Sequence, residues 1–352
     1  MPPETHHQSS GIGQSSDHAI PQTQPERDSP SCTLHLLDGV ENPVANLILI
    51  RDVSKPASST TWQLGEGKDL WPTKIPRVDI YEFVYTPIIS GETGAKTVDA
   101  LKIDLSTRLQ ELSNELGEAV MNPHNWRAKR MILVGYGYGG LLCEQVINNN
   151  VKDFSMTNIM GLVLFGTPHF APGLKQWVRI VLETIAQSES GVANKGVSIA
   201  AAGANIKKFF RRSVLSEDLE ALKGPFKQIS DVQESFFEKT TDSSWGSQIV
   251  SCFAVPPISN SENKLTILPE WSTVPYAVPV MIRKPYLGMT AFADETENGY
   301  QAISQLIRKW IEQAGTQGPG PDQEPKETGI EEEGDSEANI KKAGNEETGA
   351  RE

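Results

Sequence analysis

A glycine-rich segment, GYGYGGLL at residues 135–142, carries the sharpest chemical signal in the sequence. It stands between an apolar run and a helix-like pattern, and two kinds of chemistry use such a turn. A G-x-G-x-x-G turn binds the diphosphate of a dinucleotide, and Gly135, Gly137 and Gly140 fit this spacing. A G-x-S-x-G turn holds a serine nucleophile for acyl transfer. Gly135 and Gly139 fit its flanks, but its central position is Gly137.

The surrounding sequence disfavours dinucleotide binding. A dinucleotide fold opens with its glycine turn, whereas a long stretch of alternating strand and helix patterns precedes this one. The next buried strand, expected at 159–165, runs into Gly166 and Thr167. A dinucleotide site would place there an acidic residue that holds the ribose. The pattern therefore favours the acyl-transfer turn.

Strand-like and helix-like periods alternate along the chain, which predicts a mostly parallel sheet with helices on both faces. Strands are expected at 33–37, 46–50, 77–85, 130–134, 159–165, 248–255 and 278–282, and helices at 101–116, 141–147, 173–186 and 300–311.

Two further segments strengthen the acyl-transfer interpretation: FGTPH at 165–169, and PYLGMTAF at 285–292 followed by NGYQAISQLIRKWI at 298–311. With the glycine turn, they resemble the α/β-hydrolases related to serine-active-site lipid-remodelling enzymes. They are also similar to the hydrolase modules found ahead of fungal NACHT-type signalling ATPases. The resemblance covers most of residues 31–314. It implies an α/β-hydrolase fold, a mostly parallel central sheet flanked by helices, with a helical cap insertion expected at 187–245.

The resemblance also implies catalytic positions, and this chain departs from them. Gly137 stands where the nucleophilic serine should be, and Tyr286 stands at the position of the catalytic histidine. The segment that usually reads H-G-x-x-G and helps to form the oxyanion hole is Ile50-Arg51-Asp52-Val53 here. The strand that should precede the catalytic acid ends in Val255-Pro256-Pro257. Glu262 and Glu270 are nearby substitutes that no motif places.

The positions of the histidines along the chain also indicate that the catalytic histidine is missing, without any alignment. Acyl transfer needs a nucleophile, a base and donors for the developing oxyanion. In this fold the catalytic histidine follows the nucleophile and the acid along the chain. The six histidines end at His169, so none is available for the late position. The sequence therefore predicts that no catalytic set is intact.

Side chains near these positions are the candidates for lining a pocket or contacting a ligand: Arg51, Asp52, Tyr136, Tyr138, His169 and Tyr286. A tyrosine donates a hydrogen bond and stacks on a ligand, although tyrosines that simply fill the space fit the pattern equally. His169 follows the end of a strand. It points either toward the cleft or into a turn whose backbone satisfies its ring nitrogens.

Composition excludes several classes of protein. The 352 residues include 32 basic and 45 acidic side chains, and the net charge of −13 argues against nucleic-acid binding. No apolar run is long enough for a transmembrane helix. Three widely spaced cysteines fit neither a disulfide framework nor a zinc site, so we expect no metal or other cofactor and a reduced, cytoplasmic protein.

Polar composition at both ends of the chain predicts disordered segments at 1–30 and 315–352, which leaves 31–314 as one hydrolase-like domain. For this domain the first expectation is a non-hydrolytic protein that binds a small apolar ligand or a protein partner. One alternative is a pathway enzyme, such as a cyclase, lyase or isomerase, that uses a tyrosine or His169 as acid or base. The other is an ester or lipid hydrolase with atypical catalytic residues.

Overall fold

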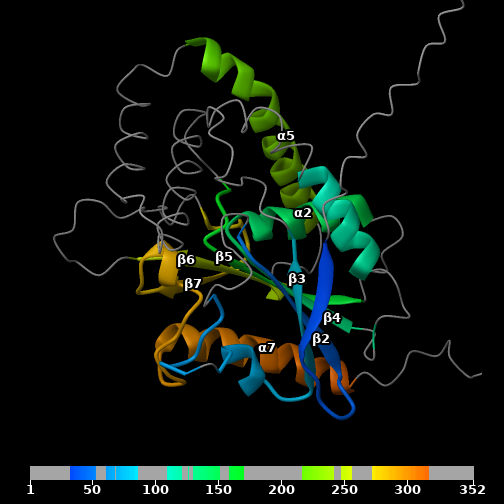
Figure 1. Ribbon diagram of the computed structural model, residues 1–352, viewed down its shortest axis with the longest axis vertical. Coiled ribbons are helices and arrows are strands. Elements are labelled where there is room, and N and C mark those ends of the chain that lie inside the picture. The colour runs from blue at the N-terminus through cyan, green and yellow to red at the C-terminus, as the bar shows by residue number, and fades with distance from the viewer. Residues whose placement is uncertain are drawn as a thin grey trace, which may run out of the picture. The chain divides into compact units, whose positions relative to one another are not determined.

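The computed structural model (Figure 1) describes residues 32–52, 61–67, 69–85, 109–120, 126, 130–150, 158–169, 216–241, 247–255 and 272–316. The expectations of disordered segments at 1–30 and 317–352, of helix at 101–108 and 173–186, and of an acid at Glu262 or Glu270 fall outside these residues. The expectation of disorder from residue 315 on is wrong for Gly315 and Thr316, which are the last residues of a helix. The chain divides into two compact units, Met1–Gly315 and Thr316–Glu352, and the fold below is that of the first.

Seven strands form one sheet in the order β1-β3-β2-β4-β5-β6-β7. The edge strand β1 runs antiparallel to β3, and all other neighbours pair in parallel. Each strand ends within two residues of its expected bounds. The bounds are β1 Thr33–Asp38, β2 Ala45–Ile50, β3 Val78–Val84, β4 Arg130–Tyr136, β5 Ile159–Phe165, β6 Ile249–Ala254 and β7 Val278–Ile282.

Helices cover both faces of the sheet (Figure 1). Ile48 and Leu133 belong to one apolar cluster together with residues 109–120, which are helical, and with α2 and α5. Their neighbours Leu47 and Ile132 belong to a second cluster with η1 and α7. Successive residues of a strand point to opposite faces, so the unbroken apolar sequence of the central strands is what two covered faces require. Besides residues 109–120, the helices of the described residues are η1 Trp71–Lys74, α2 Tyr138–Asn150, α5 Ser216–Thr241, η4 Tyr286–Gly288 and α7 Asn298–Thr316.

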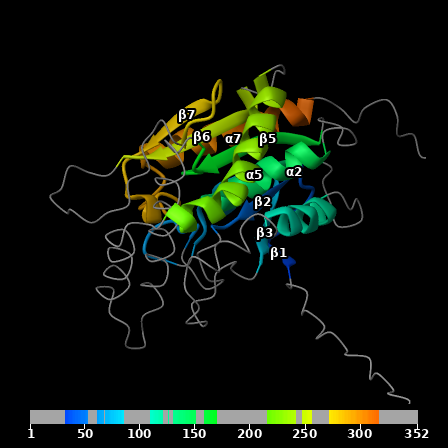
Figure 2. The same cartoon turned by 90° about the horizontal axis from the view of Figure 1, so that it is seen from above.

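The helix α5 lies beside α2 in both views (Figures 1 and 2). Asn148 of α2 donates from Nδ2 to the carbonyl of Val232, and Lys239 of α5 donates from Nζ to the carbonyl of Asn148. This helix falls within the segment 187–245, where a cap is expected, and its buried residues pack with α2 over the face of the sheet. Residues 187–215 and 242–246 lie outside the described residues.

A mostly parallel sheet, helices on both faces and a glycine turn after the central strand β4 together make up the α/β-hydrolase fold that the sequence resemblance implies. Among the described residues, no helix is both long and apolar enough to cross a membrane.

Candidate functional site

The turn between β4 and α2 consists of Gly137 alone, since the strand ends at Tyr136 and the helix begins at Tyr138. Its φ of 55° lies in the left-handed region, which glycine adopts without steric cost. Its N–H donates to the carbonyl of Phe165 at 2.9 Å. This is the tight strand-to-helix turn that the motif predicts, at the carboxyl edge of the sheet.

Close backbone packing accounts for the glycines around the turn. A Cβ at Gly135 would lie 2.5 Å from the Cα of Gly140, and a Cβ at Gly139 would lie 2.5 Å from the carbonyl oxygen of Arg51. A Cβ at Gly140 would overlap the side chain of Thr167. The first turn of α2 therefore packs directly on the ends of neighbouring strands, and the G-x-G-x-x-G spacing needs no bound phosphate to explain it.

The side chains of Asp52 and Tyr286 fill the space in front of Gly137. A Cβ at Gly137 would lie 2.5 Å from Asp52 Oδ2 and would also overlap the hydroxyl of Tyr286. The Tyr286 hydroxyl donates to Asp52 Oδ2 at 2.8 Å. Both residues are buried, with 1% of Asp52 and 2% of Tyr286 exposed. The structure thus confirms that Tyr286 lies within reach of Gly137, and it adds Asp52 as the partner of that tyrosine.

Two more candidate tyrosines flank the turn on opposite faces of the sheet. The hydroxyl of Tyr136 donates to the carbonyl of Tyr286 at 3.0 Å, and the two ring centroids lie 5.2 Å apart. Tyr138 is buried in the other apolar cluster, with α2 and α5. Tyr136 thus holds η4 against β4, while Tyr138 anchors the start of α2.

Burial raises the pKa of Tyr136, Tyr138 and Tyr286 well above the usual value, and the negative charge of Asp52 raises each pKa further. The three hydroxyls therefore stay protonated at neutral pH. In that state a tyrosine hydroxyl is a hydrogen-bond donor and not a base.

Arg51, also a candidate, forms a buried ion pair. Its guanidinium contacts Glu82 of β3 through Nε to Oε1 and through Nη2 to Oε2. The hydroxyl of Tyr85 donates to the carbonyl of Arg51 at 2.6 Å. These contacts tie the end of β2 to β3 and so fix the backbone that carries Asp52.

His169 contacts the helical layer. Its Nε2 lies 2.5 Å from Oε1 of Glu144 on α2, and neither side chain is exposed. Its ring also packs against Phe237 of α5, and Gln233 of α5 donates to the carbonyl of Pro168 at 2.7 Å. The structure thus brings Asp52, Tyr136 and Tyr286 together beside Gly137, buries Tyr138 in the other apolar cluster and engages His169 with α2 and α5.

The buried carboxylates in these two pairs are Glu82 and Glu144, and neither is among the candidates from the sequence. Each stands in a largely apolar segment, VDIYEFV in β3, where Asp79 is the other polar residue, and LLCEQVI in α2, where Gln145 is. A charged side chain in such a run needs a partner if it is buried, and this is the signal from which both pairs could be suspected.

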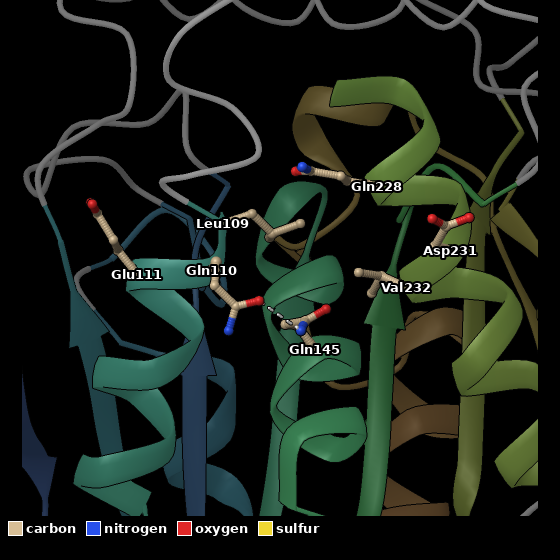
Figure 3. Close-up of a pocket in the computed structure, with 7 residues that line it drawn as sticks. All are labelled: Leu109, Gln110, Glu111, Gln145, Gln228, Asp231 and Val232. Carbon is tan, nitrogen blue, oxygen red and sulfur yellow. Dashed lines mark hydrogen bonds between the residues drawn. The ribbon is translucent and has the colours of Figure 1, made fainter. Parts of the chain in front are cut away.

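A separate pocket of about 470 Å³ lies between the 109–120 helix, α2 and α5 (Figure 3). Most of its lining side chains are polar: Leu109, Gln110, Glu111, Gln145, Gln228, Asp231 and Val232. Gln145 donates to Oε1 of Gln110 at 3.1 Å. None of the candidates from the sequence lines this pocket. The described residues include no group of three or more His, Cys, Asp or Glu side chains that could hold a metal ion.

Neither a scan against models of protein families nor a search of curated proteins found a match. Solved structures similar to this chain include a lipase-esterase related protein from Clostridium acetobutylicum, with 12% identity over 80% of this chain and 99% of that one, and a TM-score of 0.37. A serine hydrolase of the bacterium Cycloclasticus zankles has 13% identity over 83% and 97% of the two chains, and a TM-score of 0.40. A mutant of the N-acyl homoserine lactonase AidH, complexed with N-hexanoyl homoserine lactone, has 14% identity over 83% and 97%, and a TM-score of 0.39. At this identity the similarity concerns the fold alone.

Proposed function

We propose that this chain is a non-hydrolytic protein of the α/β-hydrolase fold, which acts by binding a small apolar ligand or a protein partner. The observation that carries the proposal is the hydrogen-bonded pair of Asp52 and Tyr286 in front of Gly137. These two side chains occupy the place into which a nucleophile would project from the turn.

The chemistry of the pair supports this proposal. Glycine has no side-chain atom that can attack a carbonyl carbon. A hydrolase of this fold stabilises the developing oxyanion with N–H donors at the turn. Here a buried carboxylate, Asp52, stands beside the turn. Its negative charge would repel an oxyanion and so raise the barrier to acyl transfer.

The acid–base alternative has weaker support. A catalytic base needs a pKa near the working pH, whereas burial raises the pKa of Tyr136, Tyr138 and Tyr286 away from neutrality. His169 is buried against Glu144 of α2 and Phe237 of α5. We therefore place binding ahead of a cyclase, lyase or isomerase activity.

A fluorophosphonate probe and a panel of short and long acyl esters test the absence of hydrolysis on the full-length chain. We expect neither labelling nor turnover above that of the heat-denatured protein, with an active serine hydrolase as positive control. Labelling or turnover that a single substitution at Asp52, Tyr286 or His169 abolishes would contradict the proposal.

Mass spectrometry of the purified protein then addresses what is bound. The protein is analysed first under native conditions and then after extraction with organic solvent. A co-purifying apolar molecule that is recovered unchanged supports ligand binding, and a stoichiometric protein partner supports an interaction module. Chemical conversion of an added pathway intermediate would support the enzyme alternative instead.

A further inference from the structure

Asp52 lies where the resemblance places the oxyanion-hole segment, directly after β2. The carbonyl oxygens of Ile50 and Arg51 would meet a Cβ at Gly139, so the backbone before Asp52 packs on the first turn of α2. The Asp52 carboxylate in turn lies in front of Gly137, the residue that precedes this helix. The N-terminus of a helix stabilises negative charge because its first N–H groups and aligned peptide dipoles point toward it.

We propose that the Asp52 carboxylate fills a binding site for carboxylate groups. A small free carboxylate therefore binds at this site when the Asp52 side chain is removed. The inference goes beyond the proposed function, because it concerns the position in front of Gly137 that the Asp52 side chain itself fills.

The donor to this position is held in place independently of Asp52. The backbone carbonyl of Tyr286 accepts from the hydroxyl of Tyr136, and the two rings pack together. The ring of Tyr286 also packs closely over Gly166, where a Cβ would lie 2.7 Å from Cε2. The Tyr286 hydroxyl therefore stays aimed at the same point in the absence of the Asp52 side chain.

The surroundings are built around a negative charge. The charge of Asp52 contributes to the raised pKa of Tyr136, Tyr138 and Tyr286, which places all three rings within its electrostatic reach. The Tyr286 hydroxyl is protonated at neutral pH and so remains a donor. An exogenous carboxylate would meet the donor that holds the native side chain, because the Tyr286 hydroxyl points at Asp52 while the Tyr136 hydroxyl donates to the carbonyl of Tyr286.

Thermal unfolding of the full-length Asp52→Ala variant in sodium formate tests the proposal, with sodium chloride at equal ionic strength as reference. Truncation to alanine removes a group of the size and charge of formate. We expect a saturable rise in Tm of about 2–5 °C with formate, since a ligand that binds only the folded state stabilises it by mass action. The wild type should show no such difference between the two salts.

Two controls separate a specific site from a general salt effect. Formamide, a neutral molecule of the same shape, should not stabilise Asp52→Ala. The variant Asp52→Asn keeps the shape of the side chain, leaves no room, and should not respond to formate. Adding Tyr286→Phe to Asp52→Ala should weaken the response, because the hydroxyl donor is lost.

An equal effect of formate and formamide, an equal response of Asp52→Asn, or no response of Asp52→Ala would overturn the proposal. If Asp52→Ala does not fold in chloride, folded protein recovered with formate but not with formamide supports the proposal, and recovery with neither overturns it. Ester turnover by the wild type would overturn the proposed function and leave the formate result intact, so the two failures are distinguishable.

Discussion

The hydroxyl of Tyr286 donates a 2.8 Å hydrogen bond to Oδ2 of Asp52, and so joins two residues 234 positions apart in the chain. The bond closes over Gly137, and neither side chain leaves room for a Cβ at that turn. The packing around this position therefore requires glycine. The same glycine leaves the turn without a nucleophile. It follows that restoring a serine there means inserting atoms into filled space.

Gly137→Ser should destabilise the protein by roughly 2–5 kcal/mol and should not create an esterase. The left-handed conformation costs about 1–2 kcal/mol for a residue with a Cβ, and overlap with Asp52 and Tyr286 adds about 1–3 kcal/mol of overpacking. Urea denaturation measures the loss of stability, and a fluorophosphonate probe checks that the variant has no esterase nucleophile.

Gly288→Ala is the matched control for this substitution. Gly288 lies in η4, next to the same site, yet a Cβ there would meet nothing within 4 Å. The free energy of unfolding of Gly288→Ala should stay within about 0.5 kcal/mol of that of the wild type. A Gly137→Ser variant as stable as Gly288→Ala would show that the space in front of the turn is open.

Tyr286→Phe should cost about 1–3 kcal/mol, because it removes a donor from a buried carboxylate. The interaction of the two side chains is isolated by a double-mutant cycle with Asp52→Ala, which removes the acceptor, and a coupling energy of about 1–3 kcal/mol is expected. Tyr276→Phe serves as control, since Tyr276 is 74% exposed and its substitution should change stability little. Strict additivity of the two substitutions in the cycle would refute the coupling.

The buried pair of Arg51 and Glu82 predicts an asymmetry between single and double substitutions. Arg51→Met should destabilise by about 3–5 kcal/mol, because it leaves the Glu82 carboxylate buried without its ionic partner. Adding Glu82→Leu should recover most of this loss, since two packed apolar side chains replace the pair without a buried charge.

The exposed pair of Lys227 and Asp231 on α5 is the comparison for that experiment. The two side chains are 77% and 55% exposed and 3.0 Å apart. Lys227→Met should cost no more than about 0.5 kcal/mol, because water screens the pair. Denaturant titrations of the three variants under one salt condition test the contrast, and equal costs at the two sites would argue against it.

Much of the fold can be predicted from the sequence because the central strands β4 and β5 contain continuous apolar runs. Among the predicted strand ends, the least accurate is the carboxyl end of β4, because the apolar run predicts that this strand ends at Val134. The strand continues to Tyr136, and Gly135 and Tyr136 still pair with Leu164 and Phe165. Glycine and tyrosine interrupt an apolar pattern, but neither prevents the backbone from pairing.

The contacts of the site are harder to predict than its elements. The resemblance places Tyr286 near Gly137, since both occupy catalytic positions of one fold. It also marks Asp52 as a departure, but the bond to Tyr286 depends on β2 lying beside β4 in the sheet. The pairing of His169 with Glu144 likewise depends on which side of α2 faces the end of β5, and a sequence period does not resolve this for a single charged residue.

The stability of the protein should fall steeply above about pH 10. Burial raises the pKa of Tyr85, Tyr136, Tyr138 and Tyr286 well above 10, whereas in the unfolded chain these groups titrate near 10. The stabilisation from each raised pKa is complete below the unfolded value and is lost as the pH rises toward the folded value, because the unfolded chain then binds fewer protons. Each tyrosine contributes about a tenfold change in the unfolding equilibrium constant per pH unit in this window.

Urea midpoints between about pH 9 and 11, together with tyrosinate absorbance, measure this slope. Tyr286→Phe should reduce the slope by the share of one tyrosine. Buried Cys143 and Cys252, whose thiol pKa burial also raises, add the same sign of dependence and are common to all variants. If the hydroxyl of Tyr286 ionised near pH 10 in the folded protein, the Tyr286→Phe and wild-type slopes would coincide, and the closed, donor-only arrangement in front of Gly137 would be wrong.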